Sequence, residues 1–99
     1  MKLVNFAIMQ NEGIYKLKEL TKEEFVNYVR KNEIESYISF YSTAEVLEKL
    51  TNKDIKVNKK RCYIDDKETY LIVVLKEQKR KGKRLTADDF KYFYCEYSV

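Results

Sequence analysis

Hydrophobic and polar residues are arranged along this 99-residue chain in blocks whose period changes. The first block, "MKLVNFAIM", is rich in apolar and β-branched residues and stops at a polar turn over residues 10–13, so it predicts an opening strand. "IYKLKEL" then alternates, which favours a half-exposed second strand. Thr21 and Glu24 have the spacing of a capping box, and apolar side chains follow at helical intervals, so we predict a helix over residues 22–32.

The second half of the pattern continues with the short segment "IESYIS", which predicts another strand. Ser42 and Glu45 have the spacing of a capping box, and they predict a second helix that begins after Ser42. Beyond a polar connection, "RCYI", "DDKE" and "TYLIVVLK" read as strand, turn and strand, which predicts a β-hairpin. The last of these strands is apolar on both faces, so we expect it at the centre of a sheet.

The chain closes with a single helical turn capped by Thr86 and with the strand "FYCEYSV". Helices and strands that alternate in this way predict an α/β (α+β) fold, with one mixed sheet of about five strands and flanking helices. No linker, repeat or low-complexity segment divides the chain. We therefore expect one domain over residues 1–99.

Two absences in the composition exclude classes of chemistry. The chain has no His, which removes His-based catalytic triads and His-based metal sites. Gly occurs only at positions 13 and 82 and Pro is absent, so neither the phosphate-binding loop of ATPases nor a dinucleotide fingerprint can form. No cofactor is expected from this composition.

The sequence also indicates where the protein acts. It has no apolar run long enough to cross a membrane and no signal-peptide pattern, so we expect a cytoplasmic protein without a membrane partner. Cys62 and Cys95 lie in apolar contexts far apart in the sequence, which favours two buried free thiols over a disulfide. A reducing compartment fits this reading.

Positive charge is concentrated in the second half of the chain. Residues 1–50 hold seven Lys and Arg against eight Asp and Glu, whereas residues 51–99 hold thirteen against eight. Six of the nine residues in "KEQKRKGKR", residues 76–84, are basic. An anionic partner fits this run, although a charge run taken alone is more often a solvated loop.

Candidate binding chemistry lies in "SFYSTAEVL", residues 39–47. The N-terminus of a helix is an anion site, because its first N–H groups have no partner, and we expect those of Thr43 and Ala44 to be available. Phe40 and Tyr41 stand in front of it, where Phe40 either offers a ring to a ligand or packs into the core. Ser42 either contacts a ligand or only caps its helix.

Two other polar positions leave alternatives open. Asn5, after the first predicted strand, either binds a ligand or fixes a turn. The acidic side chains of Asp65, Asp66 and Glu68 have the chemistry of metal ligands, but the spacing favours a hairpin turn, so no metal site is predicted.

Several stretches together resemble one family. These are "LVNFAI", "GIYKLKELTKEE", "STAEVLEKL", "VNKKRCYI" and "LIVVLKEQKRKGKRL". In this order and spacing they resemble the small, often virus-encoded ring nucleases that act as anti-CRISPR proteins by degrading cyclic tetra-adenylate. The resemblance implies a homodimer of mixed sheets with flanking helices, which holds the cyclic nucleotide in a pocket at the dimer interface.

The resemblance also implies catalytic groups that this chain lacks. In the family, a His before the second helix is the general acid, and an Arg and a Glu after the central strand assist. At these positions the chain has Phe40, Gln78 and Lys81. Phe cannot donate a proton, Gln carries no charge, and Lys reverses the charge of Glu. We therefore expect a protein that lacks this catalytic apparatus and keeps the binding function.

The resulting hypothesis is a sponge, which sequesters a cyclic nucleotide second messenger of immune defence without cleaving it. The residues expected to contact the ligand are Asn5, Phe6, Ser39, Phe40, Tyr41, Ser42, Thr43, Asn58, Lys59, Gln78, Lys79, Arg80 and Lys81. One alternative is an active ring nuclease that cleaves cyclic oligoadenylate with Tyr41, Lys59 or Lys81 transferring protons. Another is a regulator that binds nucleic acid through the basic run with Tyr92 and Tyr94 nearby, although nucleic acid is the less expected partner.

Overall fold

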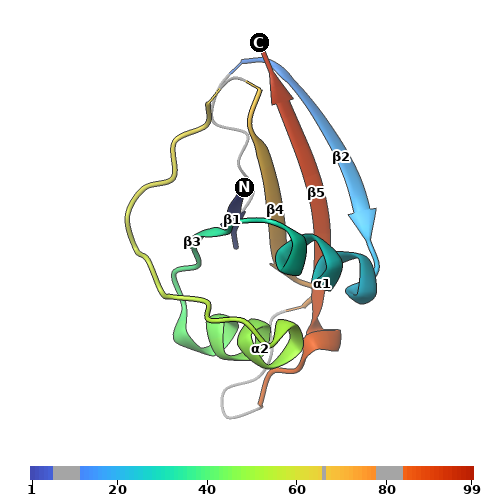
Figure 1. Cartoon of the computed structure of the whole chain (residues 1–99), viewed down its shortest axis with the longest axis vertical. Coiled ribbons are helices and arrows are strands. Elements are labelled where there is room, and N and C mark those ends of the chain that lie inside the picture. Colours follow the sequence, from blue (N-terminus) through green and yellow to red (C-terminus); the bar gives the residue numbers. More distant parts are fainter. Residues whose placement is uncertain (6–11, 66, 78–83) are drawn as a thin grey trace.

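A computed structural model describes residues 1–5, 12–65, 67–77 and 84–99 (Figure 1). The elements follow in the order β1 (Lys2–Val4), β2 (Ile14–Leu20), α1 (Lys22–Lys31), β3 (Glu35–Tyr37), α2 (Tyr41–Thr51), β4 (Thr69–Leu75), the 3-10 turn η1 (Ala87–Asp89) and β5 (Phe90–Ser98). They form one five-stranded mixed sheet with two α-helices, so the predicted α+β fold is confirmed.

The order of strands in the sheet is β2-β5-β4-β1-β3. β1 pairs in parallel with β3 and β4, whereas β5 pairs antiparallel with β4 and β2. β4 lies at the centre, as predicted, and buries four consecutive residues from Tyr70 to Val73. The parallel strands β1, β3 and β4 have their carboxyl ends on the same side of the sheet. We call this row of strand ends the carboxyl edge, and the row of opposite strand ends the amino edge.

Two core clusters lie on opposite faces of the sheet. On the front face, Phe25 and Val29 of α1 and Leu47 of α2 pack against residues such as Leu3 and Leu71 of the sheet. Both helices therefore cover the same face, as Figure 1 shows. On the reverse face, a second cluster contains Val4, Cys62, Ile64, Tyr70, Ile72, Cys95 and Tyr97. Successive strand residues point to opposite faces, so β1, β2, β4 and β5 each contribute to both clusters.

The predicted first helix is confirmed as α1, which ends at Lys31, one residue earlier than expected. The Thr21 side chain accepts a hydrogen bond from the Glu24 N–H at 3.1 Å, and the Glu24 carboxylate accepts one from the Thr21 N–H at 2.9 Å. At the other end, the Lys53 ammonium donates to the Val29 carbonyl at 2.9 Å. A cation at this end also favours the helix dipole.

The predicted hairpin is wrong, because residues 61–64 form no strand. They belong to a segment that we call the strap, residues 58–65, which covers part of the reverse face of the sheet. Cys62 and Ile64 are buried there while Arg61 and Tyr63 face outward. This alternation produced the strand-like pattern in the sequence, although its backbone joins none of the five strands.

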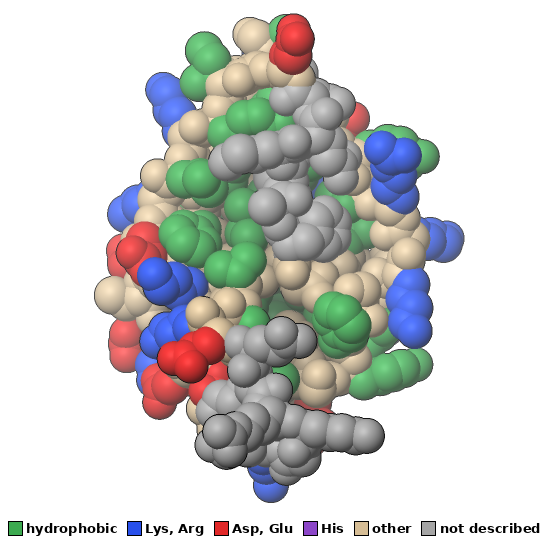
Figure 2. All heavy atoms as spheres, turned by 180° about the vertical axis from the view of Figure 1, so that it is seen from behind, with side chains coloured by type: hydrophobic (Ala, Val, Ile, Leu, Met, Phe, Trp, Pro, Cys, Tyr) green, Lys and Arg blue, Asp and Glu red, His purple; other side chains and the backbone are tan. Residues whose placement is uncertain are grey.

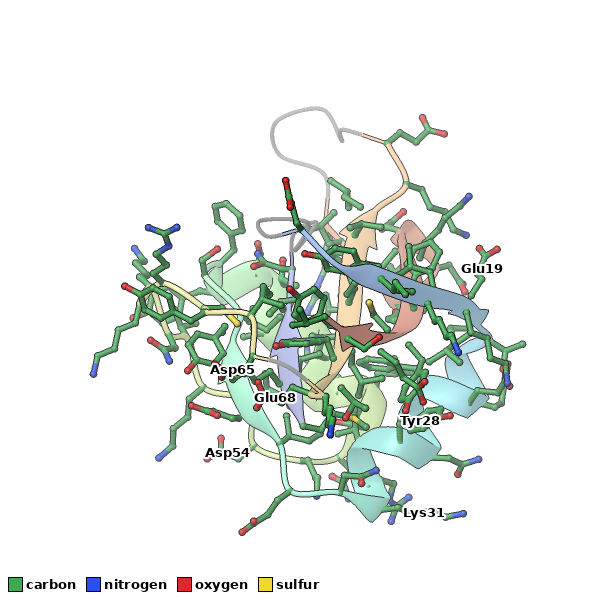
Figure 3. All side chains as sticks on the ribbon, turned by 90° about the horizontal axis from the view of Figure 1, so that it is seen from above. Glu19, Tyr28, Lys31, Asp54, Asp65 and Glu68 are labelled. Carbon is green, nitrogen blue, oxygen red and sulfur yellow. The ribbon has the colours of Figure 1, made fainter. Side chains whose placement is uncertain are left out.

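An ionic clamp holds the C-terminal part of the strap. The ammonium of Lys2, a residue only 7% exposed, contacts the Tyr63 carbonyl at 2.9 Å and the carboxylates of Asp65 and Glu68 at 3.0 and 2.9 Å. Asp65 and Glu68 lie next to each other in Figure 3. The buried Tyr70 hydroxyl donates to Glu68 and accepts from the Asp65 N–H. The "DDKE" carboxylates named as candidate metal ligands thus serve at least in part to neutralise Lys2; Asp66 lies outside the described residues.

The remaining predictions about strands, caps and cysteines can be compared with the structure. The predicted second strand and the strand within "IESYIS" are confirmed as β2 and β3, and Thr86 forms a capping box at η1. The opening strand is confirmed over Lys2–Val4 and ends before Asn5; residues 6–9 of the predicted stretch lie outside the described residues. Cys62 and Cys95 are both free and buried, as expected.

Candidate functional site

The described residues of the predicted site meet at the carboxyl edge. Asn5 directly follows β1, and residues 39–43 follow β3 into the first turn of α2. Asn58 lies beside the same strand, because its N–H donates to the Ile38 carbonyl at 2.8 Å and Val57 forms a parallel bridge with Ile38. Ligands of open α/β sheets bind outside the carboxyl ends of parallel strands, so this is the expected place for a site.

Asn5 and Ser39 bind each other. The Asn5 side-chain N–H donates to the Ser39 hydroxyl at 3.1 Å, and the Ser39 hydroxyl lies 3.3 Å from the Asn5 side-chain carbonyl. This contact joins the end of β1 to the residue that precedes α2. Both side chains are half-buried. Of the two readings of Asn5, the structure shows the one that fixes the chain, and contact with a ligand stays a prediction.

The start of α2 differs from the prediction. The helix begins at Tyr41 and its N-cap is Phe40, so Ser42 is not the capping residue. The "S-x-x-E" pattern misled because Ser42 already lies in the first turn of the helix. The first helical hydrogen bond runs from the Ala44 N–H to the Phe40 carbonyl at 3.1 Å, so the Ala44 N–H is not available to a ligand, contrary to expectation.

The first turn of α2 therefore has N–H groups without a side-chain cap. The side chain of Phe40 cannot accept a hydrogen bond, and within the described residues no side chain caps this helix. The N–H groups of Tyr41, Ser42 and Thr43 precede the first helical bond, and they carry the positive end of the helix dipole. The side chain of Thr43 is buried, so only its backbone can serve a ligand.

Both rings in front of the helix are exposed. Phe40 is 63% and Tyr41 77% exposed, which rules out the reading of Phe40 as a core residue. Exposed rings of this size beside unpaired N–H groups offer a stacking surface next to an anion site.

Asn58 and Lys59 take different roles. The Asn58 side chain donates to the Ser36 carbonyl at 3.0 Å and accepts from the Lys60 N–H at 3.0 Å, so its amide holds the N-terminal end of the strap. Lys59 is exposed. Five predicted site residues, Phe6, Gln78, Lys79, Arg80 and Lys81, lie outside the described residues. The basic run follows β4 in sequence, and β4 also ends at the carboxyl edge.

The described part of this edge holds polar groups and exposed rings. Its polar groups are amides, hydroxyls, backbone N–H groups and the cations of the strap, and the chain has no His. The described residues therefore offer charge, hydrogen-bonding groups and a stacking surface.

The ring partners of the nucleic-acid reading are not available as predicted. Tyr92 is 2% exposed, and its hydroxyl donates to the Ala87 carbonyl at 2.7 Å. Burial raises the pKa of Tyr92 to about 12. Tyr94 is half-buried and stacks on Tyr28 of α1, with ring centroids 5.0 Å apart. Both rings belong to the front face of the sheet, and they pack beneath α1.

The sequence reading missed Lys60, Arg61 and Tyr63 of the strap. Tyr63 is 64% exposed, and the Arg61 guanidinium lies 5.3 Å from the centroid of its ring. The signal was present as alternation, because Cys62 and Ile64 turn inward and force their neighbours outward. It was read as a hairpin strand instead.

The reverse face of the sheet keeps an apolar surface. Tyr15, Val74 and Phe93 are half-buried there, and Leu17 is 48% exposed. Figure 2 shows hydrophobic side chains gathered on this face. Such surfaces on folded proteins commonly mark interfaces.

The sequence matches the STIV B116-like family model over residues 1–99. The chain belongs to the STIV B116-like family. Among solved structures it is similar to "B116 of Sulfolobus turreted icosahedral virus (STIV)", with a TM-score of 0.78 and 14% sequence identity over 95% of this chain and 96% of that one. At this identity the likeness establishes the fold. The family is thus named after a viral protein, which agrees with the expected viral character.

A search of curated proteins found no match. Within the described residues, neither α-helix has the length and apolar character needed to cross a bilayer. The same residues hold no group of three or more His, Cys, Asp or Glu that could bind a metal ion.

Proposed function

We propose that this chain binds and sequesters a cyclic nucleotide second messenger without cleaving it, and so acts as a non-cleaving relative of the ring nucleases that it resembles. The observation that carries the proposal is the pair of exposed rings, Phe40 and Tyr41, at the uncapped N-terminus of α2. A nucleotide supplies both partners that this arrangement lacks, namely a phosphate for the N–H groups and a base for the rings.

The same observation favours binding over cleavage. The position where a ring nuclease has its general acid holds the ring of Phe40, which has no proton to donate. Positioned acid–base catalysis contributes about 100- to 10,000-fold to a rate, so its loss costs roughly 3–5 kcal/mol of transition-state stabilisation. Binding does not depend on this group. A stacked base contributes roughly 1–3 kcal/mol to affinity, which a ring at this position can supply.

The proposal includes a homodimer formed through the reverse face of the sheet. Leu17 and the half-buried Tyr15 and Phe93 give this face an apolar surface. Two copies packed on this face about an axis parallel to the strands bring their carboxyl edges together at one end. A ring-shaped ligand would then meet Phe40 and Lys59 from both copies.

The function is tested with the purified protein and a set of cyclic oligoadenylates, cyclic dinucleotides and cyclic ADP-ribose isomers. After separation of the complex and heat denaturation, we expect mass spectrometry to recover the ligand intact. Linear products would instead show a ring nuclease. Failure to retain any of these ligands, together with salt-sensitive binding of DNA or RNA, would favour the nucleic-acid regulator.

The role of Phe40 is tested by Phe40→Ala, with Tyr63→Ala as a matched control. The two rings are 63% and 64% exposed, so neither substitution empties the core. We expect Phe40→Ala to weaken binding by about 5- to 150-fold, which corresponds to roughly 1–3 kcal/mol of stacking. Tyr63→Ala should leave the affinity within about twofold. Equal affinities for Phe40→Ala and the unaltered protein would show that the ring has no part in binding.

The dimer is tested by placing a charge at two residues of β2 that face opposite sides of the sheet. Leu17 points to the reverse face and Ile14 to the front face, because strand residues alternate. Leu17→Lys should shift the protein to a monomer in analytical ultracentrifugation, whereas Ile14→Lys should leave the dimer intact. A monomer in the unaltered protein at high concentration would contradict the proposal.

A further inference from the structure

The strap holds three exposed cations in a row. Lys59, Lys60 and Arg61 are exposed, and none forms an ion pair with any residue in the described part of the chain. Other lysines do have carboxylate partners, for example Lys22 with Asp88 and Lys49 with Glu45. Adjacent like charges repel, so an uncompensated row of three marks a region of positive potential.

The fold fixes this row in place at both ends. At the N-terminal end, the Asn58 side chain binds the Ser36 carbonyl and the Lys60 N–H. At the C-terminal end, Cys62 is 1% exposed and Lys2 holds the Tyr63 carbonyl at 2.9 Å. The charges therefore sit on a segment anchored on both sides.

The row lies close to the proposed nucleotide site. The Asn58 N–H donates to the Ile38 carbonyl, and the chain reaches Phe40 two residues after Ile38. An extended residue spans at most about 3.6 Å, so the Cα atoms of Lys60 and Arg61 lie within about 7 and 11 Å of that of Asn58. The Debye length is about 10 Å at 0.1 M salt, so these charges act on an anion that approaches the side of the site formed by Asn58 and Lys59.

We propose that Lys60 and Arg61 steer the anionic ligand to the site and speed its capture, without contacting it once it is bound. This inference rests on the proposed function. Both side chains project outward from the strap, and the Arg61 guanidinium is stacked on the Tyr63 ring. Exposed charges of this kind change association rates, which depend on long-range potential, more than they change the contacts of the bound complex. A protein that works by capture without turnover benefits from a fast association.

The test is stopped-flow binding of cyclic tetra-adenylate to the Lys60→Gln/Arg61→Gln double variant. If only a cyclic dinucleotide is retained by the unaltered protein, that ligand is the probe. We expect the association rate constant to fall about five- to tenfold at about 0.05 M salt, and the difference to close at about 0.5 M. The dissociation rate constant should stay within about twofold.

The matched control is Lys16→Gln/Lys31→Gln, which removes the same charge from exposed residues of β2 and α1 away from the strap. Its association rate should change less than about twofold. Equal association rates in the strap variant, or a faster dissociation from it, overturn the steering role while the proposed function stands. Failure of the unaltered protein to bind any of the cyclic nucleotides overturns the proposed function and this inference with it.

Discussion

Replacement of Lys2 by Met tests the clamp that holds the strap to the sheet. The Lys2 ammonium has three oxygen partners, the Tyr63 carbonyl and the carboxylates of Asp65 and Glu68, all within 3.0 Å. Burial by itself would lower the pKa of Lys2, but the hydrogen bonds with Glu68 and Asp65 raise it above its ordinary value. The ammonium is therefore charged in the folded protein at neutral pH. Met keeps much of the length of the chain and removes the charge.

The expected loss of stability follows from the exposure of the partners. Removing one member of a buried ion pair costs about 3–5 kcal/mol when the other member stays buried and unpaired. Here the Asp65 and Glu68 side chains are 65% and 36% exposed, so water can solvate them once the ammonium is gone. Solvent screening lowers the expected cost to about 2–3 kcal/mol. For a domain of this size that corresponds to a fall of roughly 10–20 °C in Tm.

The assay is thermal and urea unfolding at a fixed protein concentration, with amide hydrogen exchange as a local readout. Exchange should rise first in the strap, whose Asp65 N–H donates to the Tyr70 hydroxyl. The control is Lys18→Met, which removes a more exposed ion pair with Glu24. It should cost less than about 1 kcal/mol, as surface pairs do. A Lys2→Met protein as stable as the unaltered one, or a strap no faster to exchange, would refute the assignment of Lys2 as the clamp.

Three further predictions concern pH and hydrogen bonds. The Lys2 ammonium lowers the pKa of Asp65 from its ordinary value of 3.8, so the stability that this carboxylate contributes is present above that value and is lost as the pH falls through the lowered pKa. Unfolding measured between about pH 2 and 5 should show this loss, and it should be smaller in Lys2→Met. Tyr92→Phe removes the hydrogen bond to the Ala87 carbonyl and should cost about 1 kcal/mol in urea unfolding with the fold retained; no change would show that this bond contributes nothing. Thr21→Ala removes the side-chain cap of α1 and should also cost about 1 kcal/mol, whereas Ser42→Ala, which removes no cap, should cost less than half of that.

Much of the fold could be predicted because local signals and burial agree. The capping box at Thr21 and the apolar spacing after it place α1 almost to the residue. The continuous apolar run of β4 places this strand at the centre of the sheet. In both cases one physical cause, burial of a face or of both faces, sets the sequence and the structure together.

The strap could not be predicted from the same signals. Alternation at residues 61–64 records that every second side chain is buried, and this holds equally for a strand and for an extended segment laid across a sheet. What decides between them is a set of contacts distant in sequence, above all the one from Lys2 to Tyr63. The start of α2 was also predicted wrongly, because the local capping pattern at Ser42 does not reveal that the helix already begins at Tyr41.

The site was predicted as a set of residues but not as a geometry. The parallel pairing of β1 with β3 brings Asn5 to Ser39, thirty-four residues apart in the chain, and no local pattern contains that pairing. This pairing also gives the two residues a structural contact, because their side chains are hydrogen-bonded to each other. The exposure of Phe40, in contrast, follows from its place at the N-cap, where the chain turns into α2.

The clamp and the proposed site lie at the two ends of one segment, and this joins stability to binding. Lys2 holds the strap at Tyr63, and the strap carries Lys59 at its other end, next to Asn58, whose N–H binds the Ile38 carbonyl. Cys62 and Ile64 are buried in the strap, so loss of the Lys2 contacts leaves the cations held by Asn58 and by the packing of these two side chains. A freed segment must then be ordered again on binding, at an entropic cost of about 1–2 kcal/mol for each residue fixed. Lys2→Met should therefore weaken nucleotide binding even at temperatures where the sheet stays folded, although Lys2 lies at the amino edge and cannot contact a ligand at the carboxyl edge.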